Sequence, residues 1–403
     1  MNVLFLTLLD FRTIEEKGIY TDLMREFVKN NHNVCIISPT EKRKNEPTVL
    51  IDGDNYKILK LRIGNIQKTN MLEKGISTIA LETKFIKGIK KYFEDVKFDL
   101  VLYSTPPITL QKAVEYIKKR DHAKTYLLLK DIFPQNSLDL GILKKTGIKG
   151  LLYYFFKRKE KRLYKYSDFI GCMSQANVDF ILENNPEISP EVVEVCPNSI
   201  EPQPILKDEA LLAEIRNKYD IPADKTVFIY GGNLGKPQGI DFLIECLRAN
   251  ENNEQVCFLI VGSGTEFSRL KKFFDTEKPR NAQLFSQLPK DEYELLAYSC
   301  DVGLIFLDKR FTIPNFPSRL LSYMQASMPV LAATDVNTDI GSVIEKGNFG
   351  FWCESGNVME FNKRVQQLCD PCLRSTMGIN ARQYLENHYT AEHSYKIIIK
   401  HFE

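Results

Sequence analysis

The fold is decided by one stretch of the chain, Thr226-Val227-Phe228-Ile229-Tyr230-Gly231-Gly232-Asn233-Leu234-Gly235-Lys236-Pro237-Gln238-Gly239. Its apolar first part is typical of a buried strand, and the following residues 240–244 have helical spacing. Glycines at such a turn let backbone N–H groups approach an anion, and the helix N-terminus favours negative charge. Lys236 adds a mobile cation. The stretch predicts a phosphate-binding strand-to-helix turn, with an ordinary glycine turn as the alternative.

Outward from this stretch, short apolar runs alternate with longer amphipathic ones on both sides. Continuous apolar strands separated by helices indicate a parallel sheet covered on both faces. The predicted fold class is therefore α/β, with two doubly wound, Rossmann-like domains facing across a cleft. Strands are expected at Val3–Leu9, Asn33–Ser38, Tyr56–Leu61, Leu100–Ser104, Lys124–Leu129, Phe169–Cys172, Val192–Cys196, Thr226–Tyr230, Gln255–Val261, Val302–Phe306 and Val330–Ala333.

The segment Pro197–Pro204 holds three prolines in eight residues, which suits a linker and neither a helix nor a central strand. We therefore expect a first domain over residues 1–198 and a second over residues 199–385. The last stretch, 386–403, is expected to form a helix that packs back across the hinge.

Bulk composition excludes several classes of protein. The 403 residues carry a formal net charge of +2, so no global field favours nucleic acid. No apolar run reaches the roughly 18 residues that a membrane-spanning helix needs, and the start of the chain resembles a buried strand more than a signal peptide. The nine cysteines form no zinc pattern, which favours reduced, buried thiols in a cytoplasmic protein.

Two further motifs follow the glycine turn. The run Val261-Gly262-Ser263-Gly264 is a second strand end with glycines, but it lacks the third glycine of a dinucleotide fingerprint, which counts against NAD. The run Pro317-Ser318-Arg319 opens a helix, where Ser318 suits a cap. Because a cation in the first turn opposes the helix dipole, Arg319 favours an anionic ligand, with a surface salt bridge as the alternative.

In their order and spacing, these three motifs resemble the retaining, family 4 type glycosyltransferases of the GT-B fold. The likeness is strongest to the bacterial branch that builds capsules, O-antigens and exopolysaccharides, including its WbuB-like members. It covers nearly the whole chain. In the first half it adds the runs 103–107 (YSTPP), 130–135 (KDIFPQ) and 197–199 (PNS).

The resemblance implies a nucleotide diphosphate sugar, expected to be UDP-linked, as co-substrate of the second domain. The diphosphate would lie at the glycine turn and the opening of the later helix, and the base beside the run 285–288. The implied donor-binding residues are Gly231, Gly232, Asn233, Lys236, Gly262, Gly264, Phe285, Gln287, Leu288, Ser318, Arg319 and Ser322. Lys236 and Arg319 would act catalytically by neutralising the leaving diphosphate, so no metal or other cofactor is expected to be obligatory.

The sequence departs from these relatives at two places. Many of them carry two glutamates eight positions apart, where this chain has Pro314 and Ser322, and the later glutamate commonly contacts the ribose. Ser322 offers only an uncharged contact there. Many relatives also have a lysine where this chain has Gln238, so one diphosphate cation is missing.

The first domain is expected to hold the acceptor. Asp131 follows the predicted strand Lys124–Leu129, where a carboxylate can accept or orient the acceptor hydroxyl's proton, or merely cap a turn before Pro134. Gly18, just before a predicted helix, either lets a substrate approach or forms a turn. In retaining transfer the donor phosphate can itself assist proton removal.

The segment Lys144–Tyr166 carries nine cations against one acid, Glu160, with aromatic and leucine residues between them. This pattern suits an anionic membrane surface, although the apolar residues could instead form the buried face of an ordinary helix. The predicted partners are a nucleotide sugar, a lipid-linked saccharide acceptor and this membrane surface, with no nucleic acid. The predicted location is the inner face of the cytoplasmic membrane.

The predicted function is thus glycosyl transfer with retention in surface polysaccharide biosynthesis. Two alternatives remain open. A nucleotide-sugar 2-epimerase shares the architecture, although none of the five histidines follows a candidate cleft strand. The second alternative is a non-catalytic protein that binds the donor or acts as a scaffold, because Ser322 and Gln238 replace residues that are expected to bind the donor.

Overall fold

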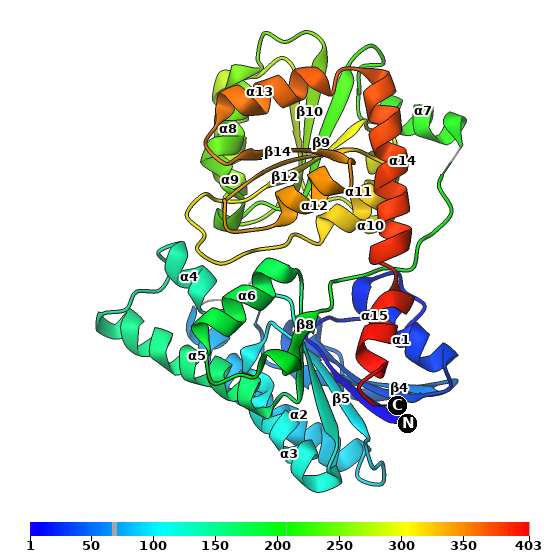
Figure 1. Ribbon diagram of the computed structural model, residues 1–403, viewed down its shortest axis with the longest axis vertical. Coiled ribbons are helices and arrows are strands. Elements are labelled where there is room, and N and C mark those ends of the chain that lie inside the picture. The colour runs from blue at the N-terminus through cyan, green and yellow to red at the C-terminus, as the bar shows by residue number, and fades with distance from the viewer. Residues whose placement is uncertain (67–70, 207, 403) are drawn as a thin grey trace. The chain divides into compact units, whose positions relative to one another are not determined.

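The computed structural model describes residues 1–66, 71–206 and 208–402. The chain folds into two compact α/β units, and each is built on its own sheet (Figure 1). The first unit comprises residues 1–201 and 391–403, and the second residues 202–390. The sequence predicts a first domain over residues 1–198, a second over residues 199–385 and a final helix over residues 386–403. The helix at the end of the chain is part of the first unit.

The first unit has an eight-stranded sheet in the order β3-β4-β2-β1-β5-β6-β7-β8. Its strands are β1 (Asn2–Leu6), β2 (Asn33–Glu41), β3 (Val49–Gly53), β4 (Tyr56–Ile63), β5 (Leu100–Ser104), β6 (Lys124–Leu129), β7 (Phe169–Cys172) and β8 (Val193–Val195). Its α-helices are α1 (Ile19–Lys29), α2 (Met71–Tyr92), α3 (Gln111–Asp121), α4 (Gln135–Asp139), α5 (Gly147–Tyr166), α6 (Gln175–Asn184) and α15 (Ala391–Ile399).

Helices cover this sheet on both faces. On one face, α1 and α15 close a core that contains Phe5, Phe27 and Tyr395, while α2, α3 and α5 pack together as a second layer (Figure 1). The centres of β1, β5 and β6 are fully buried and apolar, as parallel strands between helices require.

Two predictions about this sheet were wrong. It is not wholly parallel, because β3 pairs antiparallel with β4 at the edge through a two-residue turn, Asp54-Asn55. Asn55 has φ 58°, and such left-handed turn residues are typical of tight hairpins. The first strand also ends at Leu6 rather than Leu9, and beyond it the Ser38 hydroxyl donates to the Leu9 carbonyl oxygen and accepts from the Phe11 N–H.

The second unit has a wholly parallel six-stranded sheet in the order β11-β10-β9-β12-β13-β14. Its strands are β9 (Thr226–Asn233), β10 (Val256–Ser263), β11 (Ala282–Phe285), β12 (Val302–Phe306), β13 (Val330–Thr334) and β14 (Gly350–Glu354). Its α-helices are α7 (Glu209–Lys218), α8 (Ile240–Ala249), α9 (Phe267–Glu277), α10 (Lys290–Tyr298), α11 (Arg319–Gln325), α12 (Ile340–Lys346), α13 (Val358–Gln367) and α14 (Pro371–His388).

The strand order of this unit reverses at β9. From β9 the chain adds β10 and β11 on one side, then returns to add β12, β13 and β14 on the other. In open α/β sheets, ligands bind outside the carboxyl ends of the strands at such a reversal. The carboxyl ends of β9 and β12 are therefore where a site is expected.

Candidate functional site

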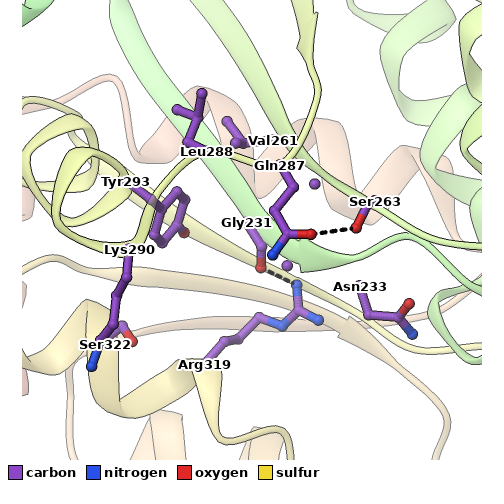
Figure 2. Close-up of a pocket in the computed structure, with 12 residues that line it drawn as sticks. Gly231, Asn233, Val261, Ser263, Gln287, Leu288, Lys290, Tyr293, Arg319 and Ser322 are labelled. Carbon is purple, nitrogen blue, oxygen red and sulfur yellow. Dashed lines mark hydrogen bonds between the residues drawn. The ribbon is translucent and has the colours of Figure 1, made fainter. Parts of the chain in front are cut away.

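A pocket of the second unit lies at the carboxyl ends of its central strands and has a volume of about 460 Å³ (Figure 2). One edge of the pocket is formed by the glycine-rich end of β9. The register of β9 and β10 sets Gly231 beside Val261 and Gly232 beside Gly262, so glycines from both strands meet at one edge. The residues that line the pocket are Gly231, Gly232, Asn233, Val261, Gly262, Ser263, Gln287, Leu288, Lys290, Tyr293, Arg319 and Ser322.

Two of the glycines are required by geometry. Gly232 has φ 128°, a conformation that residues with a Cβ rarely adopt. A Cβ on Gly231 would overlap the ring of Tyr293, which packs directly against this backbone. The loop after β9 is thus shaped by glycine so that its backbone stays open to the pocket.

Hydrogen bonds to a side chain outside the pocket hold this turn in place. The Oε1 atom of Gln238 accepts hydrogen bonds from the Gly235 backbone N–H and from Nδ2 of Asn233, both at 3.1 Å. Gln238 is buried and does not line the pocket. Its side chain orients Asn233 from behind the loop and supplies no contact to a ligand in the pocket.

Arg319 is the cation at the centre of the site. It is the first residue of α11, and its Nη1 donates to the Gly231 carbonyl oxygen at 2.7 Å, while the guanidinium lies 4.2 Å from the centre of the Tyr230 ring (Figure 2). Within the described part of the chain, no carboxylate forms an ion pair with it. Burial raises the pKa of Tyr230, and nearby Arg319 opposes that rise. A positive charge is therefore held at the glycine edge with its remaining donors available to an anion.

The pocket brings together most of the residues that the sequence pointed to. The predicted residues that line the pocket are Gly231, Gly232, Asn233, Gly262, Gln287, Leu288, Arg319 and Ser322. Four other predicted donor-site residues do not line it, namely Lys236, Gly264, Phe285 and Ser318. Lys236 begins the short 3₁₀ turn Lys236–Gln238 and is exposed. The prediction that the Ser318 side chain caps α11 was wrong, because the helix has no side-chain capping hydrogen bond.

Four lining residues were not predicted as site residues: Val261, Ser263, Lys290 and Tyr293. Ser263 donates to Oε1 of Gln287 at 2.9 Å and so orients that side chain. Lys290 and Tyr293 come from the first turn of α10 and project onto one face because they are three residues apart. In the sequence, the only signal that could have identified Lys290 and Tyr293 as site residues is their three-residue spacing directly after Leu288.

The predicted acceptor residues lie at strand ends of the first unit. Asp131 follows β6, and both its carboxylate oxygens accept from Nδ2 of Asn136, at 2.9 and 3.0 Å. Burial raises the pKa of Asp131 to about 6, although the bond from Asn136 opposes this. Gly18 precedes α1 with an extended backbone, and its N–H donates to Asp22. Neither residue lines the pocket of the second unit or the small pocket beside Ile19 and Lys130 in the first unit.

The chain also lacks features of other kinds of site. Among the described residues there is no cluster of three or more His, Cys, Asp and Glu side chains suited to a metal ion. All nine cysteines are unpaired. A search of the described helices finds none with the length and apolar character to cross a bilayer.

The comparisons with known proteins agree with this geometry. Residues 213–384 match the family model of the glycosyl transferases group 1. Two curated relatives are similar over much of the chain. The probable glycosyltransferase WbjE of Pseudomonas aeruginosa is 23% identical over 325 residues, which is 80% of this chain and 78% of that protein. The putative colanic acid biosynthesis glycosyl transferase WcaI of Escherichia coli is 24% identical over 250 residues, 62% of this chain and 60% of that protein.

The fold also recurs in solved structures. The crystal structure of Anabaena HepE in complex with UDP-glucose superposes with a TM-score of 0.67 at 15% identity, covering 100% of this chain and 99% of that one. At this identity the likeness shows the fold, which is the GT-B class of two Rossmann-like units. The second unit thus carries a glycosyl transferases group 1 domain, and the protein is an enzyme of the glycosyltransferase class.

Proposed function

We propose that this protein transfers a sugar, with retention, from a UDP-linked donor to a lipid-linked saccharide in the biosynthesis of a surface polysaccharide. The second unit binds the donor and the first unit binds the acceptor. The observation that carries the proposal is the Arg319 guanidinium, which sits at the Gly231 carbonyl in a pocket built from glycine strand ends. A nucleotide diphosphate supplies the anion that this site lacks.

The chemistry follows from the charges in the pocket. Departure of a nucleoside diphosphate from a sugar places growing negative charge on the diphosphate oxygens, and donors preorganised in a partly enclosed site stabilise that charge. Arg319, Gly232 and Asn233 line the part of the pocket where the diphosphate is proposed to lie. Lys236, exposed at the next turn, is proposed as a second cation. Because side chains provide the positive charge, the reaction needs no obligatory metal.

The nature of donor and product is supported by the relatives. HepE was solved with UDP-glucose, and WcaI is named for colanic acid biosynthesis. These names support a UDP-sugar donor and a polysaccharide product for this chain as well.

On the acceptor side, Asp131 is proposed to accept or orient the proton of the attacking hydroxyl. A carboxyl whose pKa lies at about 6 is still ionised at neutral pH, yet it is a stronger base than an ordinary aspartate. Gly18 is proposed to border the same acceptor site. The donor phosphate remains available for the same proton transfer, as retention allows.

The proposed location is the inner face of the cytoplasmic membrane, with α5 as the contact. The buried face of α5 includes Tyr153 and Leu163, whereas Ile148 is 87% and Leu151 74% exposed on the opposite side. Leu152 and Phe155, also exposed, continue this apolar stripe at helical spacing.

Charge complements this stripe. Lys144, Lys145 and Lys149 surround its start and are all exposed. The one acid of the segment, Glu160, is buried and ion-paired to Lys157 at 2.6 Å, so it does not offset them. Apolar side chains flanked by lysines fit a bilayer that contains anionic lipid, in which each surface lysine contributes about 1 kcal/mol.

Membrane contact is tested by sedimentation of the protein with vesicles of phosphatidylcholine, with and without phosphatidylglycerol. The double variant Ile148→Ser/Leu151→Ser should lose at least about tenfold in vesicle affinity, since each buried aliphatic side chain contributes roughly 1.5 to 3 kcal/mol. Met359→Ser, which changes an 84% exposed residue of α13, is the matched control and should bind as wild type. Equal binding by the double variant would refute the α5 surface.

Transfer is tested with radiolabelled UDP-sugars and a membrane extract, with product followed in the lipid fraction. Arg319→Ala should lower turnover about 10² to 10³-fold, as loss of one preorganised oxyanion donor does. Arg269→Ala, at a 52% exposed side chain, is the control. Undiminished turnover in Arg319→Ala would overturn the diphosphate assignment, and conversion of the donor without acceptor would favour an epimerase.

A further inference from the structure

The pocket is rich in hydrogen-bond donors and poor in acceptors. None of its twelve lining residues is an aspartate or a glutamate, and two of them, Lys290 and Arg319, are cations. A site of this kind suits ligand groups that accept hydrogen bonds, such as phosphate oxygens and the carbonyls of a pyrimidine.

The acceptors that are present are neutral, and two are already in use. The Gly231 carbonyl accepts from Arg319, and Oε1 of Gln287 accepts from Ser263. A ribose diol, by contrast, is best held by an ionised carboxylate, because a charged acceptor forms the stronger hydrogen bond.

In the proposed complex, the diphosphate and the nucleoside of the donor occupy different parts of the pocket. The diphosphate belongs at the edge formed by Gly231, Gly232 and Asn233, next to Arg319. The nucleoside then has the remaining wall, where Figure 2 shows Leu288 and Val261 on one side and Lys290 and Ser322 on another. The wall offers apolar surface to a base and only neutral hydroxyls, such as that of Ser322, to a sugar.

We infer that this pocket discriminates little between ribose and 2′-deoxyribose, so that its donors include deoxyribonucleoside diphosphate sugars of the thymidine type as well as UDP-sugars. The inference rests on the proposed donor function of the site. Loss of a hydrogen bond to a charged partner typically weakens binding about 10- to 150-fold, whereas loss of one neutral bond weakens it about two- to tenfold. Leu288 and Val261 also suit the extra methyl group of thymine.

The test is calorimetric titration of the full chain with UDP, 2′-deoxy-UDP and thymidine diphosphate. The dissociation constants of UDP and 2′-deoxy-UDP are expected to agree within about fivefold, as loss of at most one neutral bond requires. A preference for UDP above about tenfold would overturn the inference while leaving the proposed function intact. No binding of UDP at all would overturn the proposed function and the inference together.

A matched pair of variants isolates the missing carboxylate. Ser322→Glu places an acid at the nucleoside wall and should raise the ratio of the two dissociation constants to about tenfold or more, whereas the uncharged Ser322→Gln should leave it near the wild-type value. Because the readout is a ratio within one variant, a general loss of affinity from added negative charge cancels. An unchanged ratio in Ser322→Glu would place the ribose away from Ser322 and refute the assignment.

Discussion

Asp131→Asn is expected to stabilise the protein at neutral pH while it impairs transfer. The carboxyl of Asp131 is partly buried with one side-chain partner, Asn136, and desolvation raises its pKa from 3.8 to about 6. A shift of about two units corresponds to roughly 3 kcal/mol between the protonated and ionised forms, which is an upper limit for the cost of keeping the charge.

Asparagine removes that charge and adds a donor where one is needed. Oδ1 of Asn136 is buried and has no hydrogen-bond partner among the described residues. The new amide at position 131 can still accept from Asn136 and can also donate to this oxygen. A gain of about 1 to 3 kcal/mol is therefore expected above pH 7.

The sign of the pH dependence follows from proton binding. Because the folded-state pKa of Asp131 lies above the unfolded value, the folded protein binds more protons between about pH 4 and pH 6. Asp131 therefore favours folding below pH 4, and this contribution is lost as the pH rises through about 6. The variant lacks the dependence, so its advantage is expected to be small at pH 4 and to level off above pH 7.

Calorimetric unfolding of both proteins across this pH range measures the effect. For a unit of this size, each 1 kcal/mol corresponds to roughly 2 to 4 °C in Tm. The raised Tm should accompany a loss of transfer, because the amide cannot act as a base. A variant that is less stable at pH 7.5, or a difference in Tm that does not vary with pH, would refute the reasoning.

Three further outcomes are expected. Gly231→Ala should destabilise the second unit by about 1 to 3 kcal/mol, because the new Cβ overlaps Tyr293, and thermal unfolding with and without Tyr293→Ala checks this cause. Gln238→Leu should lower stability by about 1 to 3 kcal/mol by leaving the Gly235 N–H unpaired, whereas Gln238→Glu keeps the acceptor; equal losses in both would be inconsistent with that bond. EDTA should leave transfer unchanged, because Arg319 supplies the positive charge, and a loss restored by a divalent metal would contradict this.

The sequence predicts the strands that build the site but not the full set of residues that line it. Thr226–Tyr230 and Gln255–Val261 are apolar runs followed by glycines, so strand and turn follow from local chemistry. The edge strand β3 was missed because its apolar run is only three residues long and three of its five residues are exposed. Lys290 and Tyr293 were missed because their place depends on how α10 packs, which is a tertiary property.

The topology of the second unit explains why the position of Arg319 beside the glycine turn was predictable and the residues of the nucleoside wall were not. The reversal of strand order at β9 brings the segment after β12, which carries Arg319, back beside the glycine end of β9. Any chain with this strand order sets whichever residue stands at this position against the glycine end of β9. The nucleoside wall is different, because Lys290 and Ser322 are exposed first-turn residues of α10 and α11 that no core packing fixes. Their identity can change without cost to the fold, so we expect the choice of nucleotide to depend on exposed wall residues such as these rather than on the glycine turn.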